Sequence, residues 1–238
     1  MTTYSEASQR IGINDVLATS FLNAKLPPAA TLQNTALLLI DIQHLAEPSY
    51  HMANARAAGM PEDEVRAALA DYEARFNVAL ENASRVLEAA RAAGIPPIHV
   101  KIQALSCQGR DTSLLHSRLG WNFPPGSPAT RFLEPTKPLD DEIVITKTAS
   151  GAFTGTSLDS TLRNMGIEHL IIVGFMTDEC VETTTRVALD YGFIAQVVSD
   201  ATTTYHEESY RSTITKFASY GFTQMTDETI AQFKAMSE

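Results

Sequence analysis

The chain alternates apolar runs of strand length with a segment whose apolar residues recur at helical spacing. Residues 36–40, 95–102, 142–146 and 171–173 predict strands, and residues 61–93 predict one long amphipathic helix that ends at Gly94. Wholly apolar strands are buried on both faces, as in a parallel sheet, and a strand, helix, strand order implies a right-handed crossover. The pattern therefore predicts an α/β fold around a parallel sheet.

Two segments depart from this simple alternation. The predicted helix over 61–93 is longer than a helix that only covers a sheet, so we expect its first half to project and to pack against a second subunit. Residues 103–140 contain five prolines and little periodicity, which predicts a long loop with a short helix at 113–119. Loops of this length in compact domains are usually functional lids or interface segments.

The first 34 residues differ from the rest of the chain. They are rich in Ser, Thr, Asn, Gln and Pro, with a weakly helical patch at 15–22, and predict an N-terminal arm. With 238 residues and 44% hydrophobic content, the remainder can bury a full core. We therefore expect a single domain over residues 35–238.

Charge and cysteine content narrow the class of partner. A formal net charge of -10 argues against nucleic acid and anionic membrane surfaces, since both attract basic patches. Cys107 and Cys180 are too few for a disulfide framework, and no apolar run approaches the roughly 18 residues of a membrane span. The sequence predicts a cytoplasmic protein that acts on a small molecule.

Three residues whose side chains could take part in catalysis lie at or beyond the ends of predicted strands. Asp41 follows the strand over 36–40, Lys147 follows the strand over 142–146, and Cys180 lies beyond the strand over 171–173, at the head of a predicted helix. Alone, each has an ordinary alternative: a turn acid, a solvated charge or a small buried hydrophobe. The carboxyl ends of parallel strands share one edge, so the three are expected to meet.

Together these residues could form a nucleophile with the base and the cation that activate it. Asp41 would accept the thiol proton and Lys147 would stabilise the thiolate of Cys180. The positive end of a helix dipole at Cys180 would also favour thiolate over thiol. The set predicts a cysteine nucleophile with a lowered pKa.

Three segments carry a resemblance to a known family. They are ALLLIDIQ around Asp41, ITKTASGAF around Lys147 and HLIIVGFMTDECVETTTRVALDYGF around Cys180. They resemble the isochorismatase-like cysteine hydrolases, which include nicotinamidases, N-carbamoylsarcosine amidohydrolase and ureidoacrylate amidohydrolase, over residues of about 35 to 225.

The resemblance implies a fold and an assembly. It implies a three-layer α/β/α sandwich, Rossmann-like, with a six-stranded parallel sheet completed by strands at 193–198 and 221–225. Helices at 206–219 and 227–236 would pack on that sheet. It also implies a non-proline cis peptide between Phe175 and Met176, and a homodimer or homotetramer.

The resemblance further implies roles for individual residues. Asp41, Lys147 and Cys180 would form a catalytic triad, and the backbone N–H groups of Met176 and Cys180 would form the oxyanion hole. The expected substrate contacts are Gln43, Phe153, Thr177 and, from the proline-rich loop, Trp121. An aromatic residue in such a loop can equally serve to hold the loop in place.

Two departures from the family restrict the substrate. Nicotinamidases carry an Asp-x-His metal motif after the second strand, where this chain has Lys-Ile-Gln-Ala at 101–104, and no pair of histidines has a zinc-like spacing. True isochorismatases of this fold lack the nucleophilic cysteine. The sequence therefore predicts no metal or other cofactor, and cleavage of a C–N bond in a small amide, ureide or carbamoyl compound through a thioester, with release of ammonia or a small amine.

Other functions remain open at this point. The chain could hydrolyse another small substrate without covalent catalysis, or act as a thiol redox protein in which Cys107 resolves an oxidised Cys180. A catalytically silent oligomeric scaffold is a further alternative. The intact set of Asp41, Lys147 and Cys180 favours the hydrolase, and the acyl group of the substrate stays undetermined.

Overall fold

A computed structural model describes residue 16 and residues 28–238. Most of the predicted arm over 1–34, including all but one residue of the helical patch at 15–22, lies outside the described residues. The main helices and strands are, in chain order, β1 (Thr35–Ile40), α2 (Pro48–Ala57), α3 (Glu62–Ala93), β2 (Pro97–Ile102), α4 (Leu114–Arg118), β3 (Ile143–Lys147), α5 (Leu158–Asn164), β4 (His169–Phe175), α6 (Glu182–Asp190), β5 (Ile194–Thr203), α7 (Glu207–Ser219), β6 (Thr223–Gln224) and α8 (Thr226–Ser237).

Within residues 28–238 the strands form one six-stranded sheet in which every neighbouring pair is parallel. The strand order is β3-β2-β1-β4-β5-β6, the order of doubly wound α/β proteins. This confirms the predicted fold class. Strands β2 and β3 are added on one side of β1, and β4, β5 and β6 on the other. The strand order therefore reverses between β1 and β4, which is the switch point where such sheets bind ligands.

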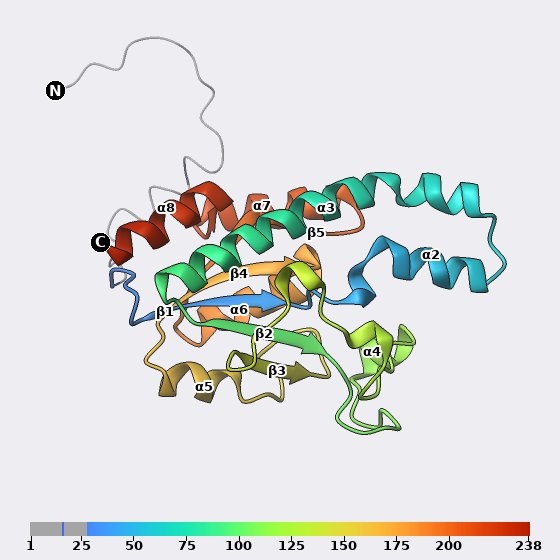
Figure 1. The fold of residues 1–238 in the computed structure, drawn as a ribbon, viewed down its shortest axis with the longest axis horizontal. Helices are drawn as coiled ribbons and strands as arrows, with labels where there is room; N and C mark the ends of the chain where they lie inside the picture. Colours follow the sequence, from blue (N-terminus) through green and yellow to red (C-terminus); the bar gives the residue numbers. More distant parts are fainter. Residues whose placement is uncertain (1–15, 17–27) are drawn as a thin grey trace, which may run out of the picture.

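Helices cover both faces of the sheet, and the alternation along β1 shows how (Figure 1). Leu37 and Leu39 belong to the core shared with α3 and α8, whereas Leu38 and Ile40 belong to the core shared with α5, α6 and α7. All four side chains are buried, and burying each stabilises the fold by roughly 2 kcal/mol. A strand with two apolar faces therefore specifies the three layers.

Helix α3 is longer than the sheet that it covers. Its 32 residues span about 48 Å, and its C-terminal half carries most of the buried side chains, among them Ala83, Val86 and Leu87. The N-terminal half extends past the sheet and lies beside α2 (Figure 1). The predicted bounds and the predicted projection are confirmed, but the helix that packs on the projecting half is α2 of the same chain. A contact with a second subunit stays a prediction.

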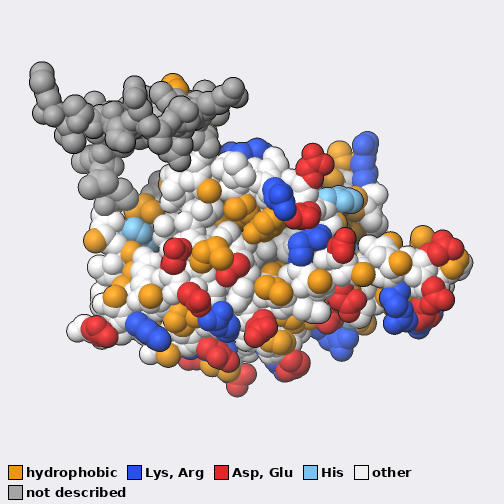
Figure 2. Space-filling model, turned by 90° about the horizontal axis from the view of Figure 1, so that it is seen from above, with side chains coloured by type: hydrophobic (Ala, Val, Ile, Leu, Met, Phe, Trp, Pro, Cys, Tyr) orange, Lys and Arg blue, Asp and Glu red, His pale blue; other side chains and the backbone are white. Residues whose placement is uncertain are grey.

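Charged residues cover the projecting end of the molecule. Glu62 at the start of α3 pairs with Arg56 of α2 and with Arg66, each at 2.8 Å. Figure 2 shows acidic and basic side chains interspersed over this end, as expected for a solvated surface. Among the described residues, no helix is both long enough and apolar enough to cross a lipid bilayer.

The last two strands differ from the predicted ranges. β5 has ten residues and runs to Thr203, beyond the predicted end at 198, and its register against β4 shifts between Ile172 and Gly174. β6 keeps only two of the five predicted residues and pairs on one side alone. The second half of β5 is polar, so no apolar run marks it, and an edge strand has few backbone partners to extend it.

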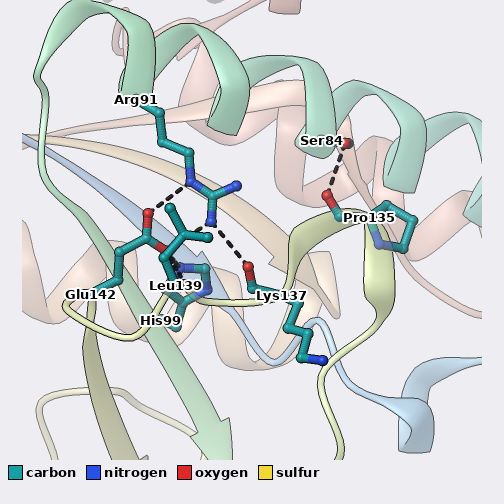
Figure 3. A network of polar contacts seen from close by, with 7 residues as sticks. All are labelled: Ser84, Arg91, His99, Pro135, Lys137, Leu139 and Glu142. Atoms are coloured by element: carbon teal, nitrogen blue, oxygen red, sulfur yellow. Dashed lines mark hydrogen bonds and ion pairs between the residues drawn. The ribbon is translucent and has the colours of Figure 1, made fainter.

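A polar network ties the segment before β3 to the helix layer (Figure 3). Glu142 accepts hydrogen bonds from Arg91 Nε at 2.7 Å, from Arg91 Nη2 at 2.8 Å and from the Leu139 N–H at 2.9 Å. His99 Nε2 of β2 lies 2.9 Å from the same carboxylate. Burial alone would raise the pKa of Glu142, but these donors, led by Arg91, lower it to about 2.

Replacement of Glu142 by Gln tests this network. The pKa of Glu142 is lower in the folded state than its ordinary value of 4.5, so its stabilisation is present above that value and lost as pH falls towards about 2. We expect Glu142→Gln to lower the free energy of unfolding at pH 7 by about 1 to 3 kcal/mol. Its stability should also depend less on pH between about 5 and 2 than that of the wild type.

Urea denaturation across this pH range measures both effects. Glu207→Gln is the control, because Glu207 forms an exposed pair with Arg211 and such pairs contribute about 0.5 kcal/mol or less. A Glu142→Gln protein as stable as the control would contradict the role given to the network.

Candidate active site

Asp41 lies directly after β1, where the backbone turns sharply. Its φ is 51°, in the left-handed region that Asp tolerates better than most residues. The Asp41 N–H donates to Val100 O of β2 at 3.0 Å, which fixes the turn against the neighbouring strand. The side chain is thereby held at the carboxyl edge of the sheet and is almost fully buried.

Strand β4 passes very close to the end of β1 at Gly174. A Cβ atom at this position would come within 2.0 Å of Ile40 O, and the glycine φ is 119°. Only glycine permits both. The next peptide bond, between Phe175 and Met176, is cis, at the position that the resemblance implies.

Cys180 follows in a short π-helical turn, Thr177–Val181, that precedes α6. This turn continues without a break into α6, so Cys180 lies in the first turn of the helix as expected, and that turn is wider than an α-helical one. Such π turns are frequent at functional sites. The turn places the Cys180 thiol beside Asp41 and beneath a small pocket.

Lys147 is the last residue of β3 and reaches across the end of β2 to the other two groups. Its Nζ lies 2.8 Å from Asp41 Oδ2 and 3.3 Å from Cys180 Sγ. It also donates to Ala149 O at 3.0 Å and to Ser150 O at 2.9 Å. The structure thus brings together the three residues that the strand ends single out.

The Asp41 carboxylate is buried but keeps free acceptor capacity. Its contact with Lys147 is that of an ion pair, and neither oxygen has a well-aligned hydrogen bond among the described residues. Burial raises the pKa of Asp41, and Lys147 opposes this rise only in part. A carboxylate with a raised pKa and free lone pairs is suited to accept a proton.

Burial alone would lower the pKa of Lys147 and raise that of Cys180. For Lys147 burial alone would lower the pKa, but the Asp41 carboxylate and the Cys180 sulfur raise it, so the ammonium stays charged. For Cys180 burial raises the pKa, Asp41 adds to the rise, and Lys147 opposes it. The expected lowering of the thiol pKa is therefore not found, because desolvation of a thiolate outweighs the single nearby cation.

A small pocket lies above the thiol. Its cavity volume is about 10 Å³, which is room for about one water. Trp121 and Met176, both expected at the site, line it. The complete lining is Asp41, Leu45, Ala46, Ile102, Trp121, Phe175, Met176, Glu179, Cys180 and Tyr205.

Three of the expected substrate contacts do not line this pocket. Gln43 is fully buried, with its amide bound to the backbone of Ile102 and to Thr130 O, so it fastens the end of β2. The ring of Phe153 stacks in the core against other aromatic rings, and the hydroxyl of Thr177 bonds to that of a threonine in β5 at 2.8 Å. These side chains are occupied by contacts within the protein.

Two polar residues of the pocket were not singled out by the sequence. Glu179 directly precedes Cys180, and that adjacency was the available signal. Tyr205 follows the end of β5, and residues after strand ends are candidates for the site. The second half of β5 is polar, however, so the sequence does not show that the strand extends to Thr203. Leu45 and Ala46 come from the short segment after β1.

The two cysteines lie in different environments. Both are free thiols; Cys107 is exposed and Cys180 is buried. Within residue 16 and residues 28–238, no group of three or more His, Cys, Asp or Glu side chains is placed to hold a metal ion.

The fold and the three buried groups define an α/β protein with its site at the switch point of a parallel sheet. Residues 35–229 match the family model described as the isochorismatase domain. The chain therefore belongs to the isochorismatase family of hydrolases, which confirms the resemblance seen in the sequence.

Individual relatives are similar over most of the chain. An uncharacterized isochorismatase family protein of Bacillus subtilis, YddQ, is 29% identical over 71% of this chain and 78% of its own length. The ureidoacrylate amidohydrolase RutB of Acinetobacter baylyi is 26% identical over 84% of this chain and 81% of its own length. A cysteine hydrolase of Pseudomonas syringae pv. phaseolicola superposes with a TM-score of 0.71 at 21% identity, over 89% of this chain and 97% of that one.

The raised thiol pKa can be tested by alkylation. Because burial and Asp41 hold Cys180 protonated, we expect its reaction with iodoacetamide to be slow at neutral pH and still to increase above the ordinary thiol range of about 8.5. Asp41→Asn should move this profile to lower pH and Lys147→Met to higher pH, since these residues respectively raise and lower the thiol pKa.

The measurement is mass spectrometry of the two cysteine peptides as a function of pH. The exposed Cys107 provides the internal control for reagent and pH. A Cys180 labelling rate that reaches its plateau below pH 7 would show a stabilised thiolate and refute this reading of the site.

Proposed function

We propose that this protein hydrolyses a C–N bond of a small amide, ureide or carbamoyl compound through a thioester on Cys180. The observation that carries the proposal is the buried Lys147 ammonium, 3.3 Å from Cys180 Sγ and 2.8 Å from Asp41 Oδ2, beside a pocket. The names of amidohydrolase relatives such as RutB support the bond class.

Nucleophile formation follows from the electrostatics of the site. In the resting site Asp41 is a carboxylate, Lys147 an ammonium and Cys180 a neutral thiol. Transfer of the thiol proton to Asp41 exchanges a buried carboxylate for a buried thiolate, so the number of charges in the site is unchanged. Lys147 pairs with whichever partner is negative, which keeps the transfer free of a further desolvation penalty.

Attack and collapse then use the same groups. The Cys180 thiolate adds to the substrate carbonyl, and the backbone N–H groups of Met176 and Cys180 are proposed to bind the resulting oxyanion, at roughly 3 to 4 kcal/mol for each donor. The protonated Asp41 gives its proton to the leaving nitrogen as the C–N bond breaks. Ammonia or an amine departs and a thioester remains on Cys180.

Hydrolysis of the thioester regenerates the enzyme. Asp41, again a carboxylate, accepts a proton from the attacking water, and the tetrahedral intermediate expels the Cys180 thiolate. The proton on Asp41 returns to the sulfur, and the acid product leaves. Each step needs Asp41 and Cys180, and Lys147 stabilises the negative charge throughout.

Single and double replacements test this unit. We expect Cys180→Ala, Asp41→Asn and Lys147→Met each to lower kcat by at least about 10³-fold, and the double replacement Asp41→Asn with Cys180→Ala to cost little more than either single one. Ammonia release from a panel of ureido acids, carbamoyl amino acids and small amides is the assay. Circular dichroism checks that each variant is folded.

Cys107→Ser is the matched control. Cys107 is exposed, so its replacement should leave turnover unchanged, whereas a redox function that resolves through Cys107 would be lost. Turnover retained in Cys180→Ala would leave a hydrolase in which water attacks directly and would rule out the thioester.

A further inference from the structure

Glu179 is a carboxylate in the pocket that the proposed mechanism does not use. It directly precedes Cys180, is half-buried and lines the same pocket. Among the described residues its side chain forms no ion pair or hydrogen bond, whereas the other carboxylate of the pocket, Asp41, is paired with Lys147. Glu179 therefore lines the pocket without a hydrogen-bond or ion-pair partner among the described residues.

The other residues that line the pocket carry no positive charge. Most are apolar, and the polar one besides Asp41 and Cys180 is Tyr205, whose hydroxyl lies 3.2 Å from His51 Nε2 and is thus engaged. Within the described residues no Arg or Lys lines the pocket. The ammonium of Lys147 lies within 3.3 Å of Asp41, Cys180 and two backbone carbonyls, and at Glu179 it offsets the effect of burial only in part.

An unpaired carboxylate in an apolar wall discriminates between ligands by charge. A cationic group placed against it regains the interaction that burial removed, whereas a second carboxylate would be desolvated beside a like charge. Burial raises the pKa of Glu179, the neighbouring Asp178 adds to the rise, and Lys147 opposes it in part. A bound cation would offset both contributions.

We infer that Glu179 determines specificity: it selects amide substrates whose far end carries a cationic nitrogen and rejects those whose far end carries a carboxylate. The inference rests on the proposed amidohydrolase function, and it names the substrate class of that site. Glu179 acts on binding and is not required for the bond-breaking steps.

Three amides of matched length test the inference: β-alaninamide, which is cationic, butyramide, which is neutral, and succinamate, which is anionic. We expect the wild type to show kcat/KM at least about tenfold higher for the cation than for the neutral amide, and lowest for the anion. Glu179→Gln should reduce the differences to within about threefold, mainly through KM for the cation, with kcat for butyramide little changed.

Asp178→Asn is the matched control. Asp178 is the adjacent carboxylate but lines a different hollow, with Glu182 and His206, so this variant should keep the wild-type order of the three amides. Should Glu179→Gln fail to fold, Glu179→Ala and the wild-type order itself still report on the charge preference.

Binding to the Cys180→Ala variant separates this inference from the proposed function. Calorimetry with the same three amides measures the charge preference without turnover. If no amide is turned over yet the cation binds best, the hydrolase proposal fails and the inference about Glu179 stands. A preference for succinamate, no preference for the cation in either assay, or an unchanged order in Glu179→Gln would overturn the inference.

Discussion

A fully buried ammonium is the constraint on which the site depends. Lys147 is among the largest completely buried side chains of the described residues, and an unpaired charge in its position would cost roughly 3 to 5 kcal/mol. The strand order β3-β2-β1-β4 supplies its partners from both sides: two carbonyls after β3, a carboxylate after β1 and a thiol after β4. The close approach of β4 to β1 at Gly174 completes this arrangement.

The burial of Asp41, Lys147 and Cys180 also determines the chemistry of the site. A desolvated thiol stays protonated until Asp41 takes its proton, so formation of the nucleophile depends on proton transfer within the site. The pocket has room for about one water. Trp121 reaches the pocket from the long segment between β2 and β3.

Much of this architecture could be predicted from the sequence because buried positions are apolar and recur with the period of a strand or helix. β1 and β4 read as apolar runs since both faces are covered, and the strand-end argument found Asp41, Lys147 and Cys180. Helix α2 has no buried residues, and the second half of β5 is polar, so neither shows apolar periodicity. The sequence does not show in which direction a side chain near a strand end points. For this reason Gln43 was expected in the pocket, whereas Glu179 and Tyr205 were not.

The central claim is that Cys180 carries the acyl group during turnover. The most direct measurement is rapid acid quenching of wild-type protein with an amide that it turns over, followed by mass spectrometry of its peptides. We expect the peptide with Cys180 to gain a mass equal to the acyl portion of the substrate, and the peptide with Cys107 to gain none. Amide hydrolysis through many turnovers with no such increment on Cys180 at any quench time would contradict the account.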